Sequence, residues 1–230
     1  MDAIILAGGY GTRLKELIPD TQKVVAEVKC RPFITYILEE LYSEGVRRVI
    51  LALGYKAEET LKIVLDFVPK DMAIIPSVEI EPLGTAGAIR NALPFIKSEE
   101  LLIVNGDSII NFSLKRLVDF HKKNNALVSI ILCKVKDIRR YGNVILNKNY
   151  QIEFFKEKIS DTKNPEGLIN AGIYIFPKNL IAKMPIGFAS IEENIFPNLC
   201  GKGLYGFEID SDFIDIGTPD AYQKAQSFFD

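Results

Sequence analysis

The sequence has few of the residues that covalent cross-links and metal clusters require. Its 230 residues include three cysteines, Cys30, Cys133 and Cys200, and one histidine, His121. Three widely spaced cysteines fit neither a disulfide framework nor a zinc cluster, so reduced thiols are expected. The pattern identifies no serine or cysteine partner for His121, so we expect this histidine to be structural and predict no covalent catalysis.

Long apolar runs and an excess of charge of one sign are also missing. No run approaches the roughly 20 apolar residues of a membrane span, so none is predicted. The 28 Lys and Arg against 30 Asp and Glu give a formal net charge of −2, and nucleic-acid binding is not expected. The first residues, Met-Asp and then an apolar run, show no signal peptide, so a cytoplasmic location is expected.

The residues that are present predict a globular α/β protein. About half of them, 48%, are hydrophobic, which is enough to bury a full core over this length. Up to residue 125, apolar runs rich in β-branched residues alternate with helical periodicity. Strands are predicted over 3–7, 47–53, 72–76 and 101–107, and helices over 34–41, 58–68, 84–93 and 114–123. This alternation is typical of a parallel sheet with helices on both faces.

From residue 126 the pattern changes to strands. Strands are predicted over 128–135, 143–146, 151–155, 168–176, 204–209 and 213–216, with a hairpin turn at 147–149 and helices over 191–199 and 220–228. No linker separates the two halves. The predicted fold is therefore a single α/β domain with a mixed, largely parallel central sheet.

A glycine-rich turn follows the first strand. It reads Gly8-Gly9-Tyr10-Gly11-Thr12-Arg13-Leu14, with Lys23 nearby. Glycines let the backbone come within contact of a ligand, and amide groups beside two cations suit an anion such as a nucleoside triphosphate. The turn lacks the third glycine of a Rossmann fingerprint and the Gly-Lys-Ser/Thr of a P-loop. A purely structural turn is the alternative, but such a turn requires neither cation.

Four carboxylates stand at informative positions. Asp107 ends a predicted strand, where ligands of open α/β sheets collect. Asp215 lies between apolar neighbours on another strand, which is costly unless the acid is paired or bound to a cation. Glu79 and Glu81 precede a stretch of small residues, where a carboxylate could accept two hydrogen bonds from guanine. An exposed acidic pair at a strand end is the alternative for these two glutamates.

Residues 6–14, followed by Lys23, resemble the signature of the sugar-1-phosphate nucleotidyltransferases. These enzymes join a nucleoside triphosphate to a sugar 1-phosphate and release pyrophosphate. The family usually has Pro-Lys-Pro around the lysine, whereas this chain has Gln22-Lys23-Val24. Residues 81–88 resemble the guanylyltransferase members, which make GDP-mannose or GDP-heptose. Asp107 and Asp215 match the family's metal-binding aspartates.

The resemblance implies a set of site residues. Catalytic roles fall to Arg13, Lys23 and Asp107, and Mg²⁺ would be bound by Asp107 and Asp215. The implied nucleotide-binding residues are Leu6, Ala7, Gly8, Gly9, Gly11, Thr12, Arg13, Lys23, Glu79, Glu81, Gly84, Thr85 and Gly87, with Glu81 as the main reader of the base. The implied sugar-phosphate-binding residues are Asn105, Gly142, Glu157, Lys158 and Asn170. Without the resemblance, Glu157 and Lys158 would be interpreted as a solvated surface pair.

The resemblance also implies a fold and a reaction. The fold would be the Rossmann-like, GT-A-like fold of the nucleotide-diphospho-sugar transferases, with residues 1–125 binding the nucleotide and 126–230 the sugar phosphate. GTP would donate GMP to D-glycero-α-D-manno-heptose 1-phosphate, favoured because the chain is as short as the heptose enzymes. The GDP-sugar would serve capsule or lipopolysaccharide synthesis. Mannose 1-phosphate, or dTTP, CTP or UTP, is the alternative, and a homodimer is a reasonable expectation.

Two other classes of function share part of this pattern. A glycosyltransferase of related fold would show an Asp-x-Asp metal motif, where this chain has Asp107-Ser108-Ile109. A non-catalytic nucleotide-sugar-binding module could keep the glycine turn, but it would need neither both aspartates nor Lys23. Release of pyrophosphate would distinguish the transferase from both.

Overall fold

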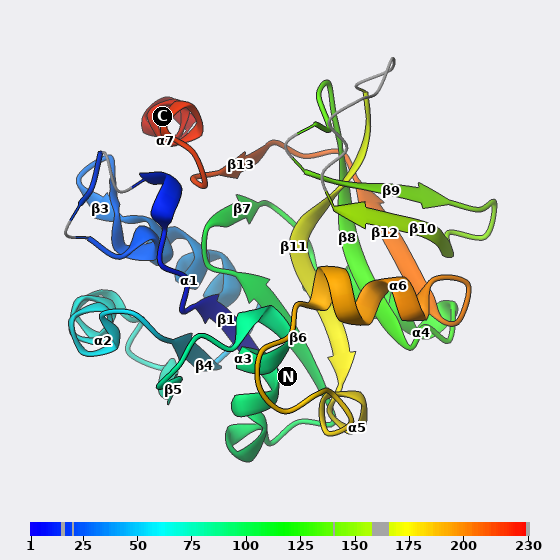
Figure 1. Ribbon diagram of the computed structural model, residues 1–230, viewed down its shortest axis with the longest axis horizontal. Coiled ribbons are helices and arrows are strands. Elements are labelled where there is room, and N and C mark those ends of the chain that lie inside the picture. The colour runs from blue at the N-terminus through cyan, green and yellow to red at the C-terminus, as the bar shows by residue number, and fades with distance from the viewer. Residues whose placement is uncertain (15–16, 20, 140, 158–165, 229–230) are drawn as a thin grey trace.

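The computed structural model describes residues 1–14, 17–19, 21–139, 141–157 and 166–228 (Figure 1). Within these residues the centre of the molecule is a nine-stranded sheet. Its main path runs in the order β10-β9-β11-β6-β1-β4-β5, while β8 pairs with β11 and β12. None of the described helices has the length and apolar character needed to span a bilayer.

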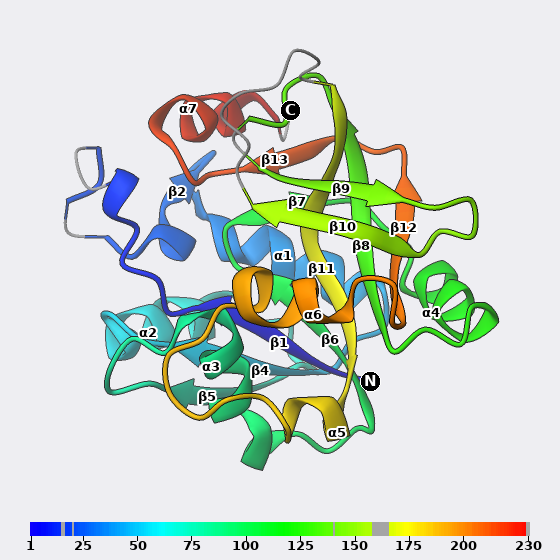
Figure 2. The same cartoon turned by 45° about the vertical axis from the view of Figure 1, so that its right-hand side comes forward.

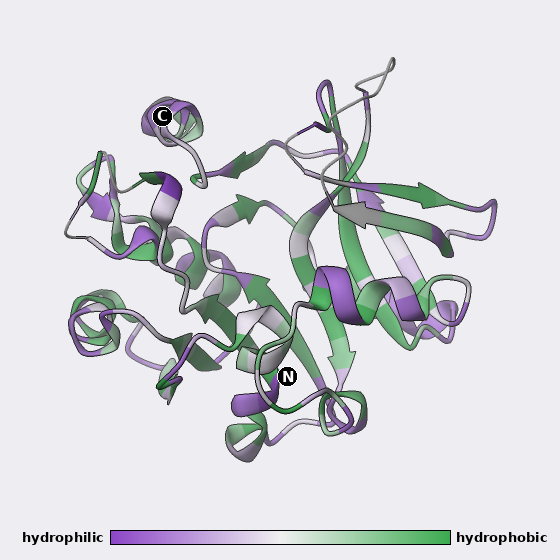
Figure 3. Ribbon diagram, viewed as in Figure 1, coloured by the Kyte–Doolittle hydropathy of each residue, from purple (hydrophilic) through white to green (hydrophobic). Residues whose placement is uncertain are grey.

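The first half of the chain builds the parallel part of this sheet. Its strands are β1 (Asp2–Ala7), β4 (Arg48–Leu53), β5 (Ala73–Val78) and β6 (Glu100–Asn105), and β1 lies between β4 and β6. In β1, Ile4 and Ile5 point to opposite faces and both are fully buried. Burial on both faces explains why these strands are continuous apolar runs, and Figure 3 shows the central strands as largely hydrophobic.

Helices cover both faces of the sheet, as predicted. On the face of Ile5 pack α1 (Phe33–Ser43), α2 (Ala57–Phe67) and α7 (Pro219–Phe228). On the face of Ile4 pack α3 (Gly84–Asn91) and α6 (Phe196–Leu199). Figure 2 shows α1 and α3 on opposite sides of β1. The predicted mixed, largely parallel α/β fold is confirmed.

The strand β11 (Gly167–Pro177) joins the two halves of the chain. It pairs antiparallel with β8 (Val128–Val135) on one side, and on the other side with β9 (Gly142–Leu146) near its start and with β6 near its end. β9 and β10 (Ile152–Glu157) form the predicted hairpin, and β12 (Leu204–Ile209) lies parallel to β8. The helix α4 (Leu114–Lys123), from the end of the first half, packs against β8 and β12, and α5 (Lys178–Ile181) follows β11. One sheet therefore runs through both predicted halves.

Three local features differ from the sequence prediction, and the first is an unpredicted ribbon of β2 (Glu27–Val28) and β3 (Arg31–Pro32). The short strand β7 (Ser108–Ile110) was not predicted, and it pairs antiparallel with β13 (Phe213–Asp215). The helix expected over 191–199 is divided into a π-helical turn, η4 (Ile191–Ile195), and α6. Pro197 near the start of α6 has no N–H to donate to the preceding turn, so a continuous α-helix is interrupted there.

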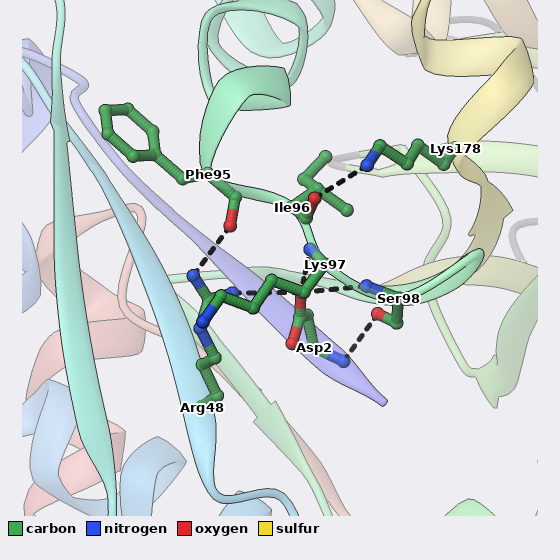
Figure 4. A network of polar contacts seen from close by, with 7 residues as sticks. All are labelled: Asp2, Arg48, Phe95, Ile96, Lys97, Ser98 and Lys178. Atoms are coloured by element: carbon green, nitrogen blue, oxygen red, sulfur yellow. Dashed lines mark hydrogen bonds and ion pairs between the residues drawn. The ribbon is translucent and has the colours of Figure 1, made fainter.

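A polar network closes the edge of the sheet where β1 begins (Figure 4). The Oδ2 atom of buried Asp2 accepts hydrogen bonds from Arg48 Nη1 at 2.9 Å, Lys97 N at 2.6 Å and Ser98 N at 3.2 Å. Arg48 Nη2 also donates to the carbonyl of Phe95 at 2.7 Å. The network ties β1 and β4 to the segment that leads into β6, at the edge opposite the strand ends described next.

Candidate active site

A cavity of about 290 Å³ opens where β1 and β6 end. Such strand ends are where open α/β sheets bind ligands. The walls come from β1 and the glycine turn, from the residues around Lys23, from 79–88 and from the end of β6. The lining residues are Leu6, Ala7, Gly8, Gly9, Tyr10, Gln22, Lys23, Val24, Glu79, Pro82, Gly84, Thr85, Ala88, Asn105, Asp107 and Phe188.

The glycine turn is packed closely against the segment that carries Lys23. Gly11 has a positive φ of 58°, and a methyl group on it would lie 3.1 Å from the Cβ of Lys23. Both the backbone conformation and the close approach therefore favour glycine here. By contrast, a methyl group on Gly9, which lines the cavity, would meet no described residue other than its chain neighbours within 4 Å.

Lys23 and Asp107 form an ion pair in the cavity wall. Lys23 Nζ donates to Asp107 Oδ2, and the two side chains are 16% and 30% exposed. Burial by itself would raise the pKa of Asp107, but the Lys23 ammonium and its hydrogen bond, helped by the charge of Arg13, hold this pKa below its usual range. Asp107 is therefore a carboxylate at neutral pH, directed at a cation.

The β7–β13 ribbon brings Asp215 beside Asp107. Asp215 pairs with Ser108, and the carbonyl of Asp107 accepts a 2.9 Å hydrogen bond from Ile216 N. A methyl group on Gly217 would lie 2.6 Å from Asp215 Oδ1 and 3.9 Å from Arg13 Nη2. Arg13, exposed on the 3-10 turn η1 (Thr12–Leu14), therefore reaches the same region.

This region is chemically suited to a magnesium ion. Mg²⁺ prefers oxygen ligands and is commonly held by one or two carboxylates, with phosphate oxygens and water completing its shell. The described residues contain no group of three or more His, Cys, Asp and Glu that could enclose a metal. Two aspartates on adjacent backbone segments fit an ion that is bound together with a phosphate ligand better than a structural metal.

Glu79, rather than Glu81, lies in the cavity wall. The backbone of Glu79 continues the β5–β4 pairing, since its N–H donates to the Leu53 carbonyl at 2.8 Å. Its carboxylate accepts from Leu83 N at 3.3 Å and packs against Gly8 and Gly54, where added methyl groups would lie 2.8 and 2.6 Å from Oε1. Burial raises the pKa of Glu79 and the Leu83 hydrogen bond opposes that rise. Glu81 is exposed and is not among the lining residues.

The start of α3 is held by the chain around Ala189. The Ala189 carbonyl accepts hydrogen bonds from Ala86 N at 2.9 Å and Gly87 N at 3.3 Å. A methyl group on Gly87 would lie 2.3 Å from the carbonyl oxygen of Gly187, so glycine is required for this close packing. Thr85 Oγ1 donates to Glu192 Oε2 at 2.7 Å, which ties the cavity wall to η4. Gly84 and Thr85 line the cavity, but Gly87 does not.

The strand β11, from the second half of the chain, approaches the cavity beside Asn105. Gly172, at φ 79°, lies so close that a methyl group on it would be 2.8 Å from Asn105 Nδ2. Nearby, Asn170 donates from Nδ2 to the Tyr174 hydroxyl at 2.8 Å and accepts from Gly172 N at 2.9 Å. Asn105 Oδ1 is buried and has no hydrogen-bond partner among the described residues. Such an acceptor is suited to a donor on a bound ligand.

The comparisons with known proteins agree with this geometry. The sequence profile described as "Nucleotidyl transferase" matches residues 2–230. The chain belongs to the nucleotidyl transferase family. The fold and the enzyme class implied by the sequence signature are thereby confirmed.

Among its relatives are bacterial heptose enzymes. The D-glycero-alpha-D-manno-heptose 1-phosphate guanylyltransferase of Aneurinibacillus thermoaerophilus is 36% identical over 98% of this chain and 97% of its own length. The enzyme of the same name from Campylobacter jejuni is 35% identical over 96% and 97%. The mannose-1-phosphate guanylyltransferase of Mycobacterium tuberculosis is 33% identical, but the match spans 99% of this chain and 64% of that protein.

Solved structures show the same fold. The crystal structure of HddC from Yersinia pseudotuberculosis complexed with GMP-PN superposes with a TM-score of 0.87 at 33% identity, covering 100% of this nucleotidyl transferase and 99% of that chain. A glucose-1-phosphate thymidylyltransferase from Bacillus anthracis, 22% identical, superposes with a TM-score of 0.84 and supports the fold alone.

The structure gathers about half of the predicted site residues of this nucleotidyl transferase around the cavity. The predicted residues that line it are Leu6, Ala7, Gly8, Gly9, Lys23, Glu79, Gly84, Thr85, Asn105 and Asp107. The predicted residues outside the lining are Gly11, Thr12, Arg13, Glu81, Gly87, Gly142, Asn170 and Asp215. Glu157 ends β10, its side chain is not among the described parts, and Lys158 lies outside the described residues.

Six lining residues were not predicted, namely Tyr10, Gln22, Val24, Pro82, Ala88 and Phe188. Tyr10 lies in the glycine-rich turn, and Pro82 and Ala88 lie in the stretch that begins at Glu79. Predicted site residues adjoin each of the three in sequence. Gln22 carried a signal of its own, as a polar residue where the family usually has proline. No motif points to Phe188, whose place depends on how the 185–191 segment docks on α3.

Proposed function

We propose that this protein transfers GMP from GTP to a sugar 1-phosphate and releases pyrophosphate. The observation that carries the proposal is the meeting of Lys23 and Asp107 on a cavity walled by the glycine turn. A triphosphate needs amide groups and cations, and the reaction needs a carboxylate positioned for a metal beside them. The other partners proposed are Asp215 and Arg13, which lie at the same edge.

We assign the reading of the base to Glu79. An ionised carboxylate can accept hydrogen bonds from both N1–H and the amino group of guanine, whereas thymine, uracil and cytosine do not offer that pair of donors. Glu79 is half-buried beside Gly8, and its position in the wall is fixed by the Leu83 amide. The relative crystallised with GMP-PN is in keeping with a guanine nucleotide.

The chemistry requires two anions to be brought together. The phosphate oxygen of the sugar 1-phosphate is largely ionised near neutral pH, since its second pKa is about 6, so no general base is needed. The protein must hold this oxygen in line with the α-phosphorus and the departing pyrophosphate. Lys23 stabilises charge that develops at the α-phosphate, and Arg13 offsets charge on the triphosphate. Each cation acts by position, without proton transfer.

Asp107 and Asp215 would hold Mg²⁺ in this scheme. When bound, the ion would neutralise phosphate charge and orient the α-phosphate. Because Lys23 pairs with Asp107 in the free protein, Lys23 must exchange this carboxylate for a phosphate oxygen as the substrates bind. The pairing keeps the lysine within reach of the metal site until that exchange.

The acceptor proposed first is D-glycero-α-D-manno-heptose 1-phosphate. Two relatives with this acceptor in their names are 36% and 35% identical to this chain over 98% and 96% of its residues. Asn105 Oδ1, an acceptor without a partner in the described structure, is proposed to receive a sugar hydroxyl. Mannose 1-phosphate is the second candidate, since the mannose enzymes are similarly identical over the shared region.

The test is release of pyrophosphate with Mg²⁺, measured for GTP, dTTP, CTP and UTP, each with heptose 1-phosphate and with mannose 1-phosphate. Release with GTP and one sugar establishes the reaction and identifies the product. Release with another nucleotide keeps the transferase and removes the assignment of Glu79. If folded protein releases no pyrophosphate in any pairing, the result favours a nucleotide-sugar-binding module.

A matched pair of glutamate variants tests which residue recognises the guanine base. Glu79→Gln replaces one carboxylate oxygen with a donor in the cavity, and the preference for GTP over dTTP should fall by roughly tenfold or more. Glu81→Gln makes the same chemical change at the exposed position two residues away, and the preference should stay within twofold. A loss of this preference in Glu81→Gln but not in Glu79→Gln would instead assign recognition of the base to Glu81.

We further propose that the enzyme acts in the cytoplasm, as a homodimer, in the synthesis of surface polysaccharide. Its proposed substrates are both charged metabolites, and no described helix could span a membrane. Sedimentation equilibrium would measure the oligomeric state.

A further inference from the structure

Gln22 occupies an unusual position for a polar side chain. It is 3% exposed and immediately precedes the 3-10 turn η2 (Lys23–Val25). Its Nε2 donates to the carbonyl of Ala7 at 2.7 Å and to the carbonyl of Gly9 at 2.8 Å. Its Oε1 accepts from Val24 N at 2.9 Å. Since two carbonyls require the NH₂ and one amide requires the oxygen, the orientation of this side chain is determined.

Two of the three hydrogen bonds connect the Lys23 segment to the glycine turn, and the third spans Lys23 within its own segment. Ala7 and Gly9 belong to the end of β1 and the glycine turn, whereas Val24 follows Lys23. Lys23 thus lies between Gln22, whose side chain makes these bonds, and Val24, whose amide donates to that side chain. On its other side, the Cβ of Lys23 packs on Gly11, and its Nζ reaches Asp107.

The backbone shows what the glutamine adds. Gln22 has a φ of −69°, which is the angle that a proline ring would impose. The chain therefore keeps the backbone path that suits the proline usual in the family. A proline could reproduce this angle, but it could not donate to Ala7 and Gly9 or accept from Val24. In this chain, side-chain hydrogen bonds hold the lysine segment against the glycine turn.

We propose that Gln22 is a positioning residue that fixes Lys23 relative to the glycine turn, and so sets where the ammonium meets the phosphates. This inference rests on the proposed role of Lys23 in nucleotidyl transfer. Displacement of a charged group by about 1 Å can cost one to two orders of magnitude in rate. The effect should therefore appear in turnover and should depend on the presence of the lysine.

The variant for the test is Gln22→Met, which keeps the length of the side chain and removes all three hydrogen bonds. We expect kcat to fall about tenfold, while KM for GTP changes less than threefold. In a Lys23→Ala background, Gln22→Met should change kcat less than twofold, because the group that it positions is gone. An equal loss in both backgrounds, or a kcat within twofold of wild type, would overturn the inference.

A matched control is available in Gln226→Met. Gln226 on α7 also links two backbone segments, accepting from Lys29 N and donating to the Glu27 carbonyl, both at 3.0 Å. It lies outside the cavity lining. The same substitution there should leave kcat within twofold, which separates a general loss of hydrogen bonds from a loss at the site.

A second measurement does not depend on the reaction. Labelling of Lys23 by an amine-reactive reagent, followed by mass spectrometry, reports how firmly its ammonium is held at Asp107. Gln22→Met should increase the labelling rate of Lys23 at least threefold relative to Lys202, an exposed lysine. An unchanged rate contradicts the inference even if wild-type protein releases no pyrophosphate, whereas that silence alone would remove only the proposed function.

Discussion

The Asp2 network provides a test of how this fold is held together at the edge away from the cavity. Three donors converge on one oxygen of a buried carboxylate, and Arg48 is 21% exposed. Asp2→Ala removes the acceptor of two backbone amides and of Arg48 Nη1, and leaves the guanidinium without its counter-charge, with its bond to the Phe95 carbonyl remaining. Breaking a pair of this kind costs about 3–5 kcal/mol. In a domain of this size that corresponds to a fall in Tm of about 6–20 °C.

Asp2→Asn removes the negative charge of the side chain but keeps its shape, so it measures what the charge contributes. An amide oxygen can take the place of Oδ2 and keep the three hydrogen bonds, but those from Lys97 N and Ser98 N become neutral and roughly half as strong, and Arg48 loses its counter-charge. The expected loss is about 1–2 kcal/mol, or about 2–8 °C in Tm. Thermal unfolding of the wild type and both variants measures these losses. Pyrophosphate release should be unchanged, because Asp2 is at the opposite end of β1 from the cavity.

The pH dependence follows from the same contacts. Burial favours a raised pKa for Asp2, but the Lys97 and Ser98 amides and the Arg48 charge outweigh it, so the pKa is lowered on folding. A lowered pKa stabilises the folded protein above the unfolded value of about 3.9 and ceases to do so as pH falls through the folded value. The advantage of wild type over Asp2→Asn should therefore shrink below about pH 4. A constant advantage from pH 3 to 7, or an Asp2→Ala variant that loses under 1 kcal/mol, would refute this reasoning.

Three further predictions concern the site and the core. Asp107→Asn or Asp215→Asn should lower kcat by roughly 10²-fold or more with Tm changed by only a few degrees, and full activity in both would exclude them as metal ligands. Gly87→Ala should cost about 1–3 kcal/mol in unfolding free energy because its methyl group meets the Gly187 carbonyl, whereas Gly9→Ala should leave Tm unchanged and raise KM for GTP. Burial lowers the pKa of His121, so wild type should lose stability relative to His121→Asn as pH falls below about 6.5, and parallel stability curves would contradict this.

The sequence predicted best those elements whose signal is local. The runs over 101–107 and 128–135 are long, apolar and rich in β-branched residues, and both are strands at nearly those bounds. The strand β7 was missed because Ser108-Ile109-Ile110 is too short to show a period. Its extended form depends on pairing with β13, about a hundred residues later. A pattern within one window cannot contain that information.

The lining of the cavity was also predicted best where the signal is local. Motif residues with a direct chemical signal, such as Lys23 and Asp107, meet in the cavity wall. The sequence could not predict which of Glu79 and Glu81 lies in the cavity wall, since both acids precede the same small residues. Glu79 is placed there by the hydrogen bond from its N–H to the Leu53 carbonyl, which extends the sheet by one residue. The hydrogen bonds of Gln22 likewise reach carbonyls 13 and 15 residues away.

The β7–β13 ribbon has a consequence for how the protein is made. Ribosomal synthesis is vectorial, so β1, the glycine turn, Lys23 and Asp107 all leave the ribosome before Asp215. The segments that line most of the cavity are therefore made before Asp215 is translated. With the roles proposed above, binding of a nucleotide alone could begin during translation, whereas turnover would wait until β13 has paired with β7.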